Sequence, residues 1–276
     1  MKQRVKSIFE DAMQKEIRSA NEVSEGFSNE TYEINNAYVL RLTKDNEDET
    51  INRSHEKAIY DAIAPLNISE TVLYFNEKTG SKISKLVHSS HLYVDTPTDE
   101  QIIYVAKTVK KLHNSKIQVP FGYQMFLKLN KYKEAIDKNF YLDEKIESKI
   151  VKNVQKIFAK DKLVLCHNDL VRNNLLFKYN KVTIIDWEYA GMNNPYFDLA
   201  SFISENDLTE EQEDLFLSTY FGAKYNTMKK RKVHTFMNFL DVLFYYWGLY
   251  LYKKRGDTVY KKIASHKQKR IKSLDL

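Results

Sequence analysis

Three residues with oxygen-bearing side chains recur at short spacing in the second half of the chain. Asp169 lies in the segment Cys-His-Asn-Asp-Leu (166–170), Asn174 follows five residues later, and Asp186 comes directly after the apolar segment 182–185. A carboxylate can take a proton from a hydroxyl group. Carboxylate and amide oxygens are also ligands that Mg²⁺ accepts. Each residue taken singly could shape a turn, but their combination favours a site that activates a hydroxyl next to a metal ion.

The spacing of these residues matches that of the catalytic loop and the metal-binding Asp of kinases. Phosphoryl transfer needs positioning and charge neutralisation more than covalent help from the protein. Asp169 is therefore predicted to orient the acceptor hydroxyl and take its proton. Asn174 and Asp186 are predicted to bind the Mg²⁺ that bridges the phosphates of ATP. His167 is predicted to hold the loop backbone rather than to react.

The elements that must position this site divide the chain into two parts. The first part alternates short strands with helices, and the second is largely helical, with a capping-box pattern at Thr98–Gln101. These patterns predict an α+β, protein-kinase-like fold with a nucleotide-binding lobe at 1–88, a catalytic and acceptor-binding lobe at 89–276, and a hinge near 87–91. The predicted helices are 2–20, about 50–63, 98–113, 122–139, 143–160 and most of 195–276; the predicted strands are 31–34, 37–42, 71–75, 82–87, 163–165, 175–177 and 182–185.

Two longer segments carry a family resemblance. CHNDLVRNNLLF (166–177) and IIDWEYAGMNNPYFDLASF (184–202) resemble the superfamily of choline/ethanolamine kinases and aminoglycoside phosphotransferases. The form of the first segment and the continuation at 188–190 are similar to bacterial choline kinases, and the likeness runs from about 26 to 270. It implies an ATP-dependent kinase that transfers the γ-phosphoryl group to choline and yields phosphocholine. Within this pattern Asp198 is expected to bond the catalytic loop rather than to act in catalysis.

The resemblance also implies a set of nucleotide-binding residues near the start of the chain. Gly26, Ser28 and Asn29 correspond to a shortened phosphate loop, Arg41 to the cation that contacts the phosphates, and Glu56 to its acidic partner. The alternatives are an ordinary turn, an edge-strand arginine and a surface charge on a helix. An arginine where protein kinases have lysine, and the lack of an Ala-Pro-Glu segment, argue against a protein kinase.

A quaternary ammonium acceptor would be bound by aromatic faces and a nearby carboxylate. The resemblance assigns Tyr189 and Glu205 to such a pocket, and it places Phe244 and Trp247 where the family has a Trp-x-x-Trp pair. A further family aromatic is expected near position 263, where Tyr260 is the candidate replacement. For most aromatic residues in this region, packing in the core is the alternative.

Composition excludes several other classes of protein. The net charge of +6 comes from 43 basic and 37 acidic residues spread along the chain, without the single basic stripe of a nucleic-acid binder. The basic runs 229–232 and 267–272 are predicted to be solvated helix faces, with attraction of anionic nucleotide as the alternative. The single cysteine fits a reducing cytosol. The segment 236–252 is too short and polar for a membrane span, and the start lacks the apolar core of a signal peptide.

These observations predict a cytoplasmic enzyme with a small-molecule acceptor and no nucleic-acid or membrane partner. They do not determine its oligomeric state. Kinases for ethanolamine, thiamine or an aminoglycoside remain alternatives, although an aminoglycoside would need a wide acidic cleft. A non-catalytic nucleotide-binding pseudokinase is the alternative from another class, and the intact Asp169, Asn174 and Asp186 argue against it. A basic nucleic-acid-binding helical protein is a further alternative, but no motif in the sequence supports it.

Overall fold

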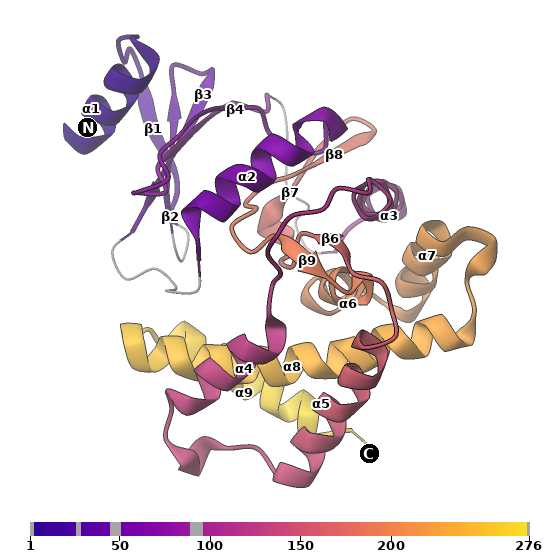
Figure 1. Cartoon of the computed structure of the whole chain (residues 1–276). Coiled ribbons are helices and arrows are strands. Elements are labelled where there is room, and N and C mark those ends of the chain that lie inside the picture. Colours follow the sequence, from indigo (N-terminus) through magenta and orange to yellow (C-terminus); the bar gives the residue numbers. More distant parts are fainter. Residues whose placement is uncertain (1–2, 26–28, 45–50, 89–95, 275–276) are drawn as a thin grey trace.

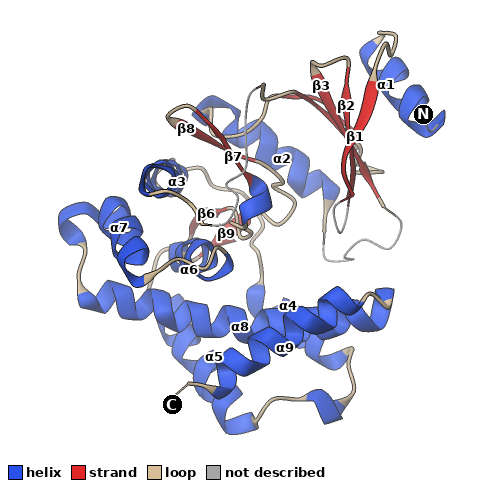
Figure 2. Ribbon diagram, turned by 180° about the vertical axis from the view of Figure 1, so that it is seen from behind, coloured by secondary structure: helices blue, strands red, loops and turns tan. Residues whose placement is uncertain are grey.

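The computed structural model describes residues 3–25, 29–44, 51–88 and 96–274. Its N-terminal part is an antiparallel sheet with the strand order β1-β2-β3-β5-β4 (Figure 1). Helix α1 packs on this sheet, and α2 lies between the sheet and the hairpin of β7 (Leu175–Lys178) and β8 (Lys181–Ile184) in both views (Figures 1 and 2). The elements of this part are α1 (Gln3–Met13), β1 (Ala20–Glu25), β2 (Asn29–Ile34), β3 (Tyr38–Thr43), α2 (Arg53–Ile63), the 3₁₀ turn η1 (Ala64–Leu66), β4 (Val72–Phe75) and β5 (Lys82–Lys85).

The β2–β3 hairpin sets the register of the sheet. Asn35 and Asn36 form its turn with φ values of 54° and 50°, the left-handed backbone that a two-residue hairpin turn needs and that asparagine tolerates. Tyr32 lies opposite Leu40, and Arg41 lies opposite Thr31. The alternating apolar residues of the hairpin turn towards α1, so Arg41 enters the other face of the sheet.

The C-terminal part is built around the long helix α8, which contacts α4, α5, α6 and α9. Asn226 caps the start of α8, and Gly256, with φ 75°, ends it. The elements are α3 (Asp99–His113), α4 (Met125–Glu134), η2 (Lys138–Phe140), α5 (Glu144–Phe158), β6 (Val164–Cys166), η3 (Arg172–Asn174), β7 (Leu175–Lys178), β8 (Lys181–Ile184), β9 (Gly191–Asn193), α6 (Pro195–Glu205), α7 (Glu210–Phe221), η4 (Gly222–Lys224), α8 (Thr227–Arg255) and α9 (Thr258–Lys272).

Helices α8 and α9 approach each other closely at Gly248. A Cβ atom at this position would lie 2.8 Å from the backbone oxygen of Tyr260, so only glycine fits without a shift of the backbone. The close approach brings the side chains of α9 against the middle of α8. Two of the acceptor residues predicted from the sequence, Phe244 and Trp247, lie on this part of α8.

Two pairs of short strands, β6–β9 and β7–β8, place the predicted catalytic residues. Asp169 follows β6, Asn174 precedes β7, and Asp186 follows β8. The β7–β8 hairpin is joined to the N-terminal part, because the backbone N–H of Ile184 donates to the oxygen of Ile68 at 2.8 Å.

The buried apolar side chains form two separate cores. The smaller core joins α1 to the sheet and includes Phe9 and Leu40. The larger core runs through the C-terminal part and includes Ile59 and Ile63 of α2. Packing therefore groups α2 with the helical part, although α2 precedes two strands of the sheet.

The predicted α+β fold, with a small antiparallel sheet followed by a large helical part, is confirmed, and so is the capping box at Thr98. The predicted opening helix 2–20 is wrong beyond Met13, because 20–25 forms strand β1. The predicted helix 122–139 is shorter, since α4 covers only Met125–Glu134. The boundary between 88 and 89 stays a prediction, because 89–95 lie outside the described residues. Among the described helices, none has the length and apolar character needed to cross a membrane.

Candidate active site

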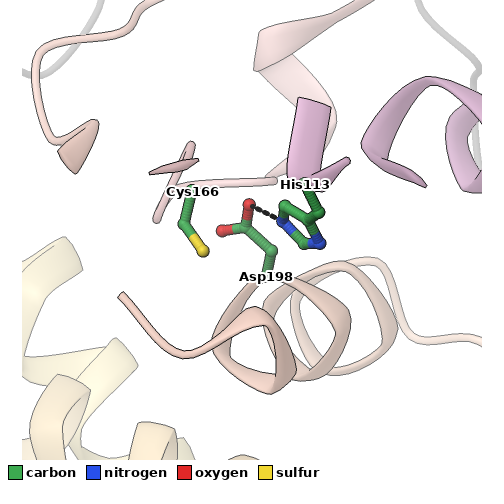
Figure 3. Close-up of side chains that lie close together, drawn as sticks. All are labelled: His113, Cys166 and Asp198. Atoms are coloured by element: carbon green, nitrogen blue, oxygen red, sulfur yellow. Dashed lines mark hydrogen bonds and ion pairs between the residues drawn. The ribbon is translucent and has the colours of Figure 1, made fainter. Parts of the chain in front are cut away.

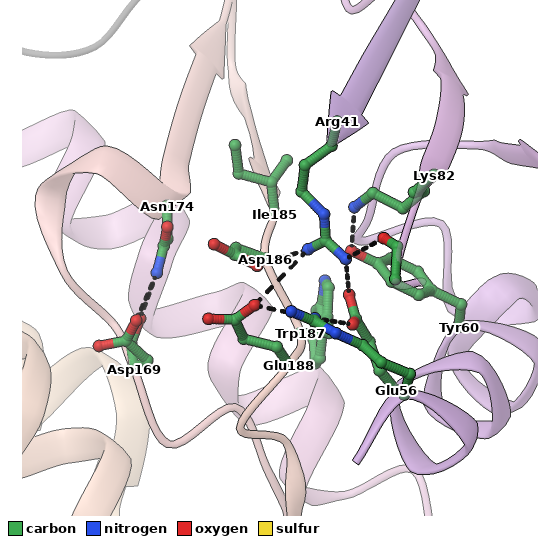
Figure 4. Close-up of polar contacts among 12 residues, drawn as sticks. Arg41, Glu56, Tyr60, Lys82, Asp169, Asn174, Ile185, Asp186, Trp187 and Glu188 are labelled. Carbon is green, nitrogen blue, oxygen red and sulfur yellow. Dashed lines mark hydrogen bonds and ion pairs between the residues drawn. The ribbon is translucent and has the colours of Figure 1, made fainter. Parts of the chain in front are cut away.

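Asp169 and Asn174 are in direct contact. The amide nitrogen of Asn174 donates to the carboxylate Oδ2 of Asp169 and to its backbone oxygen, both at 2.9 Å (Figure 4). The amide nitrogen is thereby engaged, and the side-chain oxygen of Asn174 is the atom suited to a cation. The structure therefore brings these two residues together, and their catalytic and metal-binding roles stay predictions.

His167 holds the backbone of the catalytic loop. Its Nε2 donates to the backbone oxygen of Ile185 at 3.1 Å, and its Nδ1 accepts from the N–H of Asp169 at 3.2 Å. Burial lowers the pKa of His167, so the ring is neutral and its two nitrogens take opposite roles. The ring also lies edge-on to Trp187, with centroids 4.7 Å apart. The predicted loop-holding position of His167 is therefore correct.

Asp198, in the first turn of α6, holds the same loop, and Figure 3 shows its side chain between those of Cys166 and His113. Its Oδ1 accepts from the N–H of Asn168 at 2.7 Å, and its Oδ2 accepts from the N–H of His167 at 2.8 Å. Nε2 of His113 lies 3.0 Å from the same Oδ2. Asp198 is fully buried, and it bonds the loop as the sequence analysis expected.

The side chains of His113, Cys166 and Asp198 bring their ligand atoms within 4.8 Å of one another. Three N–H groups already occupy the oxygens of Asp198. The other nitrogen of His113 lies 2.7 Å from the hydroxyl of Tyr220. Burial raises the pKa of the Cys166 thiol well above its usual value, and the thiol donates to the backbone oxygens of Asn193 and Asn194, each 3.7 Å from Sγ. The cluster is a hydrogen-bonded support of the loop, not a metal site.

Asp186 stands at the turn after β8 with φ 64°, and Asn168 has φ 68°. Left-handed backbone at residues other than glycine is uncommon and concentrates at functional sites. Oδ1 of Asp186 accepts from Arg41 at 2.8 Å, and 28% of its side chain remains exposed. A solvated cation can therefore reach this carboxylate. This carboxylate and the amide oxygen of Asn174 are oxygen groups of the kind that Mg²⁺ binds, and their role as its ligands stays a prediction.

Arg41 and Arg53 link the sheet, α2 and the segment after β8 through shared carboxylates. Figure 4 shows Arg41 beside Glu56, Asp186 and Glu188. Arg41 donates to Glu56 at 2.6 Å, and Arg53 donates to Glu56 at 2.5 Å and to Glu188 at 3.0 Å. Burial by itself lowers the pKa of Arg41, but Glu56 and Asp186 outweigh it and hold the pKa above its usual value. The Arg41–Glu56 contact that the resemblance implies is present. Its role in nucleotide binding stays a prediction.

The pKa of Asp169 is raised to about 7. Burial is the main cause and the negative charge of Asp186 is the second, while the hydrogen bond from Asn174 opposes both. The charge of Glu205 contributes in the same direction as Asp186. A carboxylate with a pKa near neutrality is well matched to accepting a proton from a hydroxyl group.

The predicted phosphate loop is described only at its end. Gly26 and Ser28 lie outside the described residues. Asn29 begins β2 and is buried, and its side-chain oxygen has no hydrogen-bond partner among the residues that the structure describes.

Three of the predicted acceptor residues lie together near α8 and α9. Glu205 ends α6, and Phe244 and Trp247 lie one turn apart on α8 with ring centroids separated by 6.1 Å. Tyr260 of α9 packs edge-on against Trp247, with centroids 5.6 Å apart. The candidate replacement for the missing family aromatic is therefore in contact with this group.

Lys267 joins these acceptor residues, contrary to the prediction that 267–272 is a solvated helix face. Its side chain is 4% exposed and its Nζ lies 2.6 Å from Oε1 of Glu205. The same Nζ lies 5.6 Å from the ring centroid of Phe244. The prediction is wrong at Lys267 because the residue lies on the buried stripe of α9, with Tyr260, Ala264 and Ile271.

Tyr189 lies in a separate group of contacts. Its ring is edge-on to Tyr123 at 6.4 Å, and the ammonium of Lys128 lies 5.1 Å from the centroid of each of these rings. The backbone oxygen of Tyr189 accepts from the side chain of Asn168 at 3.0 Å. Tyr189 is thus tied to the catalytic loop, and it is engaged by a cation as Phe244 is.

Several residues of the site were not predicted from the sequence. Arg53 and Glu188 extend the ion pair of Arg41, and only the spacing of Arg53 three residues before Glu56 hinted at this. Lys82 bonds Glu70 at 2.5 Å and the hydroxyl of Tyr60 beside the Arg41 network. Its place opposite Arg41 in the β3–β5 register could be found only once the strands were paired.

The comparisons with known proteins agree with this geometry. A family model described as phosphotransferase enzyme family matches residues 19–233. Protein LicA of Haemophilus influenzae is 30% identical over 228 residues, which cover 76% of this chain and 84% of that protein. The crystal structure of choline kinase LicA from Streptococcus pneumoniae has a TM-score of 0.84 at 21% identity and covers 99% of both chains.

A crystal structure of LicA in complex with AMP has a TM-score of 0.80 at 21% identity and covers 98% of this chain and 97% of that one. These two likenesses confirm the kinase-like fold. The family model covers most of the chain, and the curated relative is similar over three quarters of it. This chain belongs to the phosphotransferase enzyme family, in the superfamily of choline/ethanolamine kinases and aminoglycoside phosphotransferases, and it is a phosphotransferase that acts on an alcohol.

Proposed function

We propose that the chain is an ATP-dependent choline kinase. It would transfer the γ-phosphoryl group of ATP to the hydroxyl of choline, with ADP as the leaving group, and release phosphocholine. Two similarities support the choice of acceptor: the 30% identity to Protein LicA of Haemophilus influenzae, and the shared fold of a protein described as choline kinase LicA. The residues around Glu205 support it independently.

The single observation that carries the proposal is the position of the Lys267 ammonium. It lies 2.6 Å from the carboxylate of Glu205 and 5.6 Å from the ring centroid of Phe244. A carboxylate beside an aromatic ring is the combination that attracts a quaternary ammonium, which has no N–H to donate. The same surroundings that accommodate the lysine ammonium can therefore bind the trimethylammonium group of choline.

The roles proposed for the catalytic residues follow from their chemistry. Asp169 orients the hydroxyl of choline and accepts its proton as the oxygen attacks the γ-phosphorus. Asn174 and Asp186 would hold Mg²⁺, which neutralises charge on the phosphate oxygens when it is bound. Arg41, held by Glu56, is the cation proposed for the phosphates of ATP. Asp198 keeps the loop that carries Asp169 in place.

Choline is expected to be the preferred acceptor in an ATP-consumption screen that compares choline, ethanolamine, thiamine and kanamycin. Ethanolamine carries a smaller, strongly hydrated ammonium that needs several hydrogen-bond acceptors. Each desolvated contact of a cation with an aromatic face contributes up to about 2 kcal/mol, so kcat/KM should favour choline. A higher kcat/KM for ethanolamine, thiamine or kanamycin would reject choline as the acceptor and leave the phosphotransferase chemistry intact.

Substitution of the proposed metal ligand Asp186 tests the proposed binding of Mg²⁺ and ATP. Asp186→Asn is expected to weaken binding of Mg²⁺ with a non-hydrolysable ATP analogue and to lower kcat, because an amide replaces an anionic oxygen ligand. The apparent affinity would be measured by titration of Mg²⁺ at a fixed concentration of the analogue. The matched control is Asp61→Asn, since the side chain of Asp61 is 64% exposed on α2. An unchanged Mg²⁺ titration in Asp186→Asn would exclude this residue as a ligand.

A further inference from the structure

The four charged groups around the proposed acceptor site are balanced. Glu205 and Asp241 provide two carboxylates, and Lys267 and Arg270 provide two cations. Lys267 is 4% exposed and Asp241 is 2% exposed, so water screens their interaction little. The net charge of these four groups is zero. A cationic acceptor is therefore attracted to a carboxylate of the site only if one of the two protein cations moves away from it.

Lys267 has a second carboxylate within reach. Its Nζ lies 2.6 Å from Oε1 of Glu205 and 3.4 Å from Oδ1 of Asp241. That Oδ1 is buried and has no hydrogen-bond partner in the part of the chain that the structure describes. Oδ2 of the same carboxylate is held by Nε of Arg270 at 3.0 Å. A buried oxygen without a hydrogen bond is rare in folded proteins and calls for an explanation.

We propose that Lys267 is a displaceable counter-ion of the acceptor site: its ammonium pairs with Glu205 until the cation of the acceptor takes that carboxylate, and then moves to Oδ1 of Asp241. The inference rests on the proposed function, since it needs an acceptor with a positive charge. Movement of Nζ away from Glu205 and closer to Oδ1 of Asp241 would turn the 3.4 Å contact into a charge-assisted hydrogen bond. Lys267 thereby sets how strongly the site binds a cationic acceptor.

The exchange explains why a buried lysine sits where a cation is to bind. Without any cation, Glu205, whose side chain is only 17% exposed, would carry a largely uncompensated charge, which destabilises a protein. Lys267 compensates that charge, and Asp241 compensates Lys267 once it has moved. A neutral acceptor of the same shape cannot replace the ammonium at Glu205, so it gains nothing from the exchange. Lys267 and Asp241 are therefore predicted to distinguish acceptors by charge and not by shape.

The experiment compares choline with its uncharged isostere 3,3-dimethylbutan-1-ol in steady-state kinetics. Lys267→Gln is expected to lower KM for choline by about three- to tenfold, because the internal competitor for Glu205 is removed. Asp241→Asn, which keeps both cations but removes the second partner of Lys267, is expected to raise KM for choline by a similar factor. Neither substitution should change KM for the isostere by as much as twofold.

Lys269→Gln is the matched control, because it removes one positive charge from an exposed position of the same helix. It should leave KM for both acceptors unchanged. Thermal unfolding of each variant checks the fold, and if Lys267→Gln does not fold, Asp241→Asn carries the test. The inference is overturned if either variant changes KM for both acceptors alike. It is also overturned if Lys267→Gln raises KM for choline or Asp241→Asn lowers it. Failure of the wild-type enzyme to phosphorylate choline would instead overturn the proposed function.

Discussion

Replacement of Asp169 by Asn is expected to lower kcat by about 10²–10⁴-fold, the usual contribution of a general base. The amide has nearly the same shape as the carboxylate and can still accept the hydrogen bond that Asn174 donates at 2.9 Å. It cannot take a proton from the acceptor hydroxyl. Since the loop keeps its geometry, the Kd of a non-hydrolysable ATP analogue should stay within about twofold of wild type.

The measurement is kcat at saturating ATP and choline, with the Kd of the analogue determined by calorimetry. Asp207→Asn is the matched control, because Asp207 is exposed and asparagine tolerates its positive φ of 49°. If Asp169→Asn keeps more than about a tenth of the wild-type kcat, Asp169 is not the general base.

Asp198→Ala is expected to reduce the free energy of unfolding by about 3–5 kcal/mol, because several buried donors lose their acceptor. The N–H groups of His167 and Asn168 both point at this carboxylate, at 2.8 and 2.7 Å, and His113 adds a third contact. The loop that carries Asp169 should loosen as well, so kcat falls even at temperatures where the variant remains folded.

Urea denaturation gives the free energy of unfolding, and kcat is measured well below the unfolding transition. Asp61→Ala removes a carboxylate from the exposed face of α2 and is expected to change the free energy of unfolding by less than about 0.5 kcal/mol. A loss below about 1 kcal/mol in Asp198→Ala would contradict the role of this carboxylate as the support of the loop.

The catalytic loop could be predicted from the sequence because its chemistry is local. Asp169 and Asn174 are five residues apart, and one short loop brings them into contact. The pairing of Arg41 with Glu56 was expected from the family pattern. The involvement of Arg53 was not, because its second partner, Glu188, lies 135 positions away in the sequence and only the packing of α2 brings the two together.

At two places the structure differs from what the sequence patterns predicted, and the reasons are opposite. Strand β1 reads Ala-Asn-Glu-Val-Ser-Glu, and Val23 is 59% exposed, so the apolar alternation of a half-buried strand is absent. Lys267 lies in a basic run that is typical of a solvated helix. However, Tyr260, Ala264 and Ile271 occur at helical spacing around it, and a lysine inside that stripe was a signal of burial.

The backbone hydrogen bond between Ile184 and Ile68 restricts how the two parts of the molecule can move. Ile184 leads to Asp186, and Ile68 lies between η1 and β4, while Ile59 of α2 belongs to the larger core. Rotation of residues 1–88 as one rigid unit would break this bond and open that core. The sheet and α1 have a core of their own, but buried contacts of Arg41 with Glu56 and of Lys82 with Tyr60 join the sheet to α2 as well. A movement of the sheet over α2 would therefore have to separate these buried charged side chains from their partners.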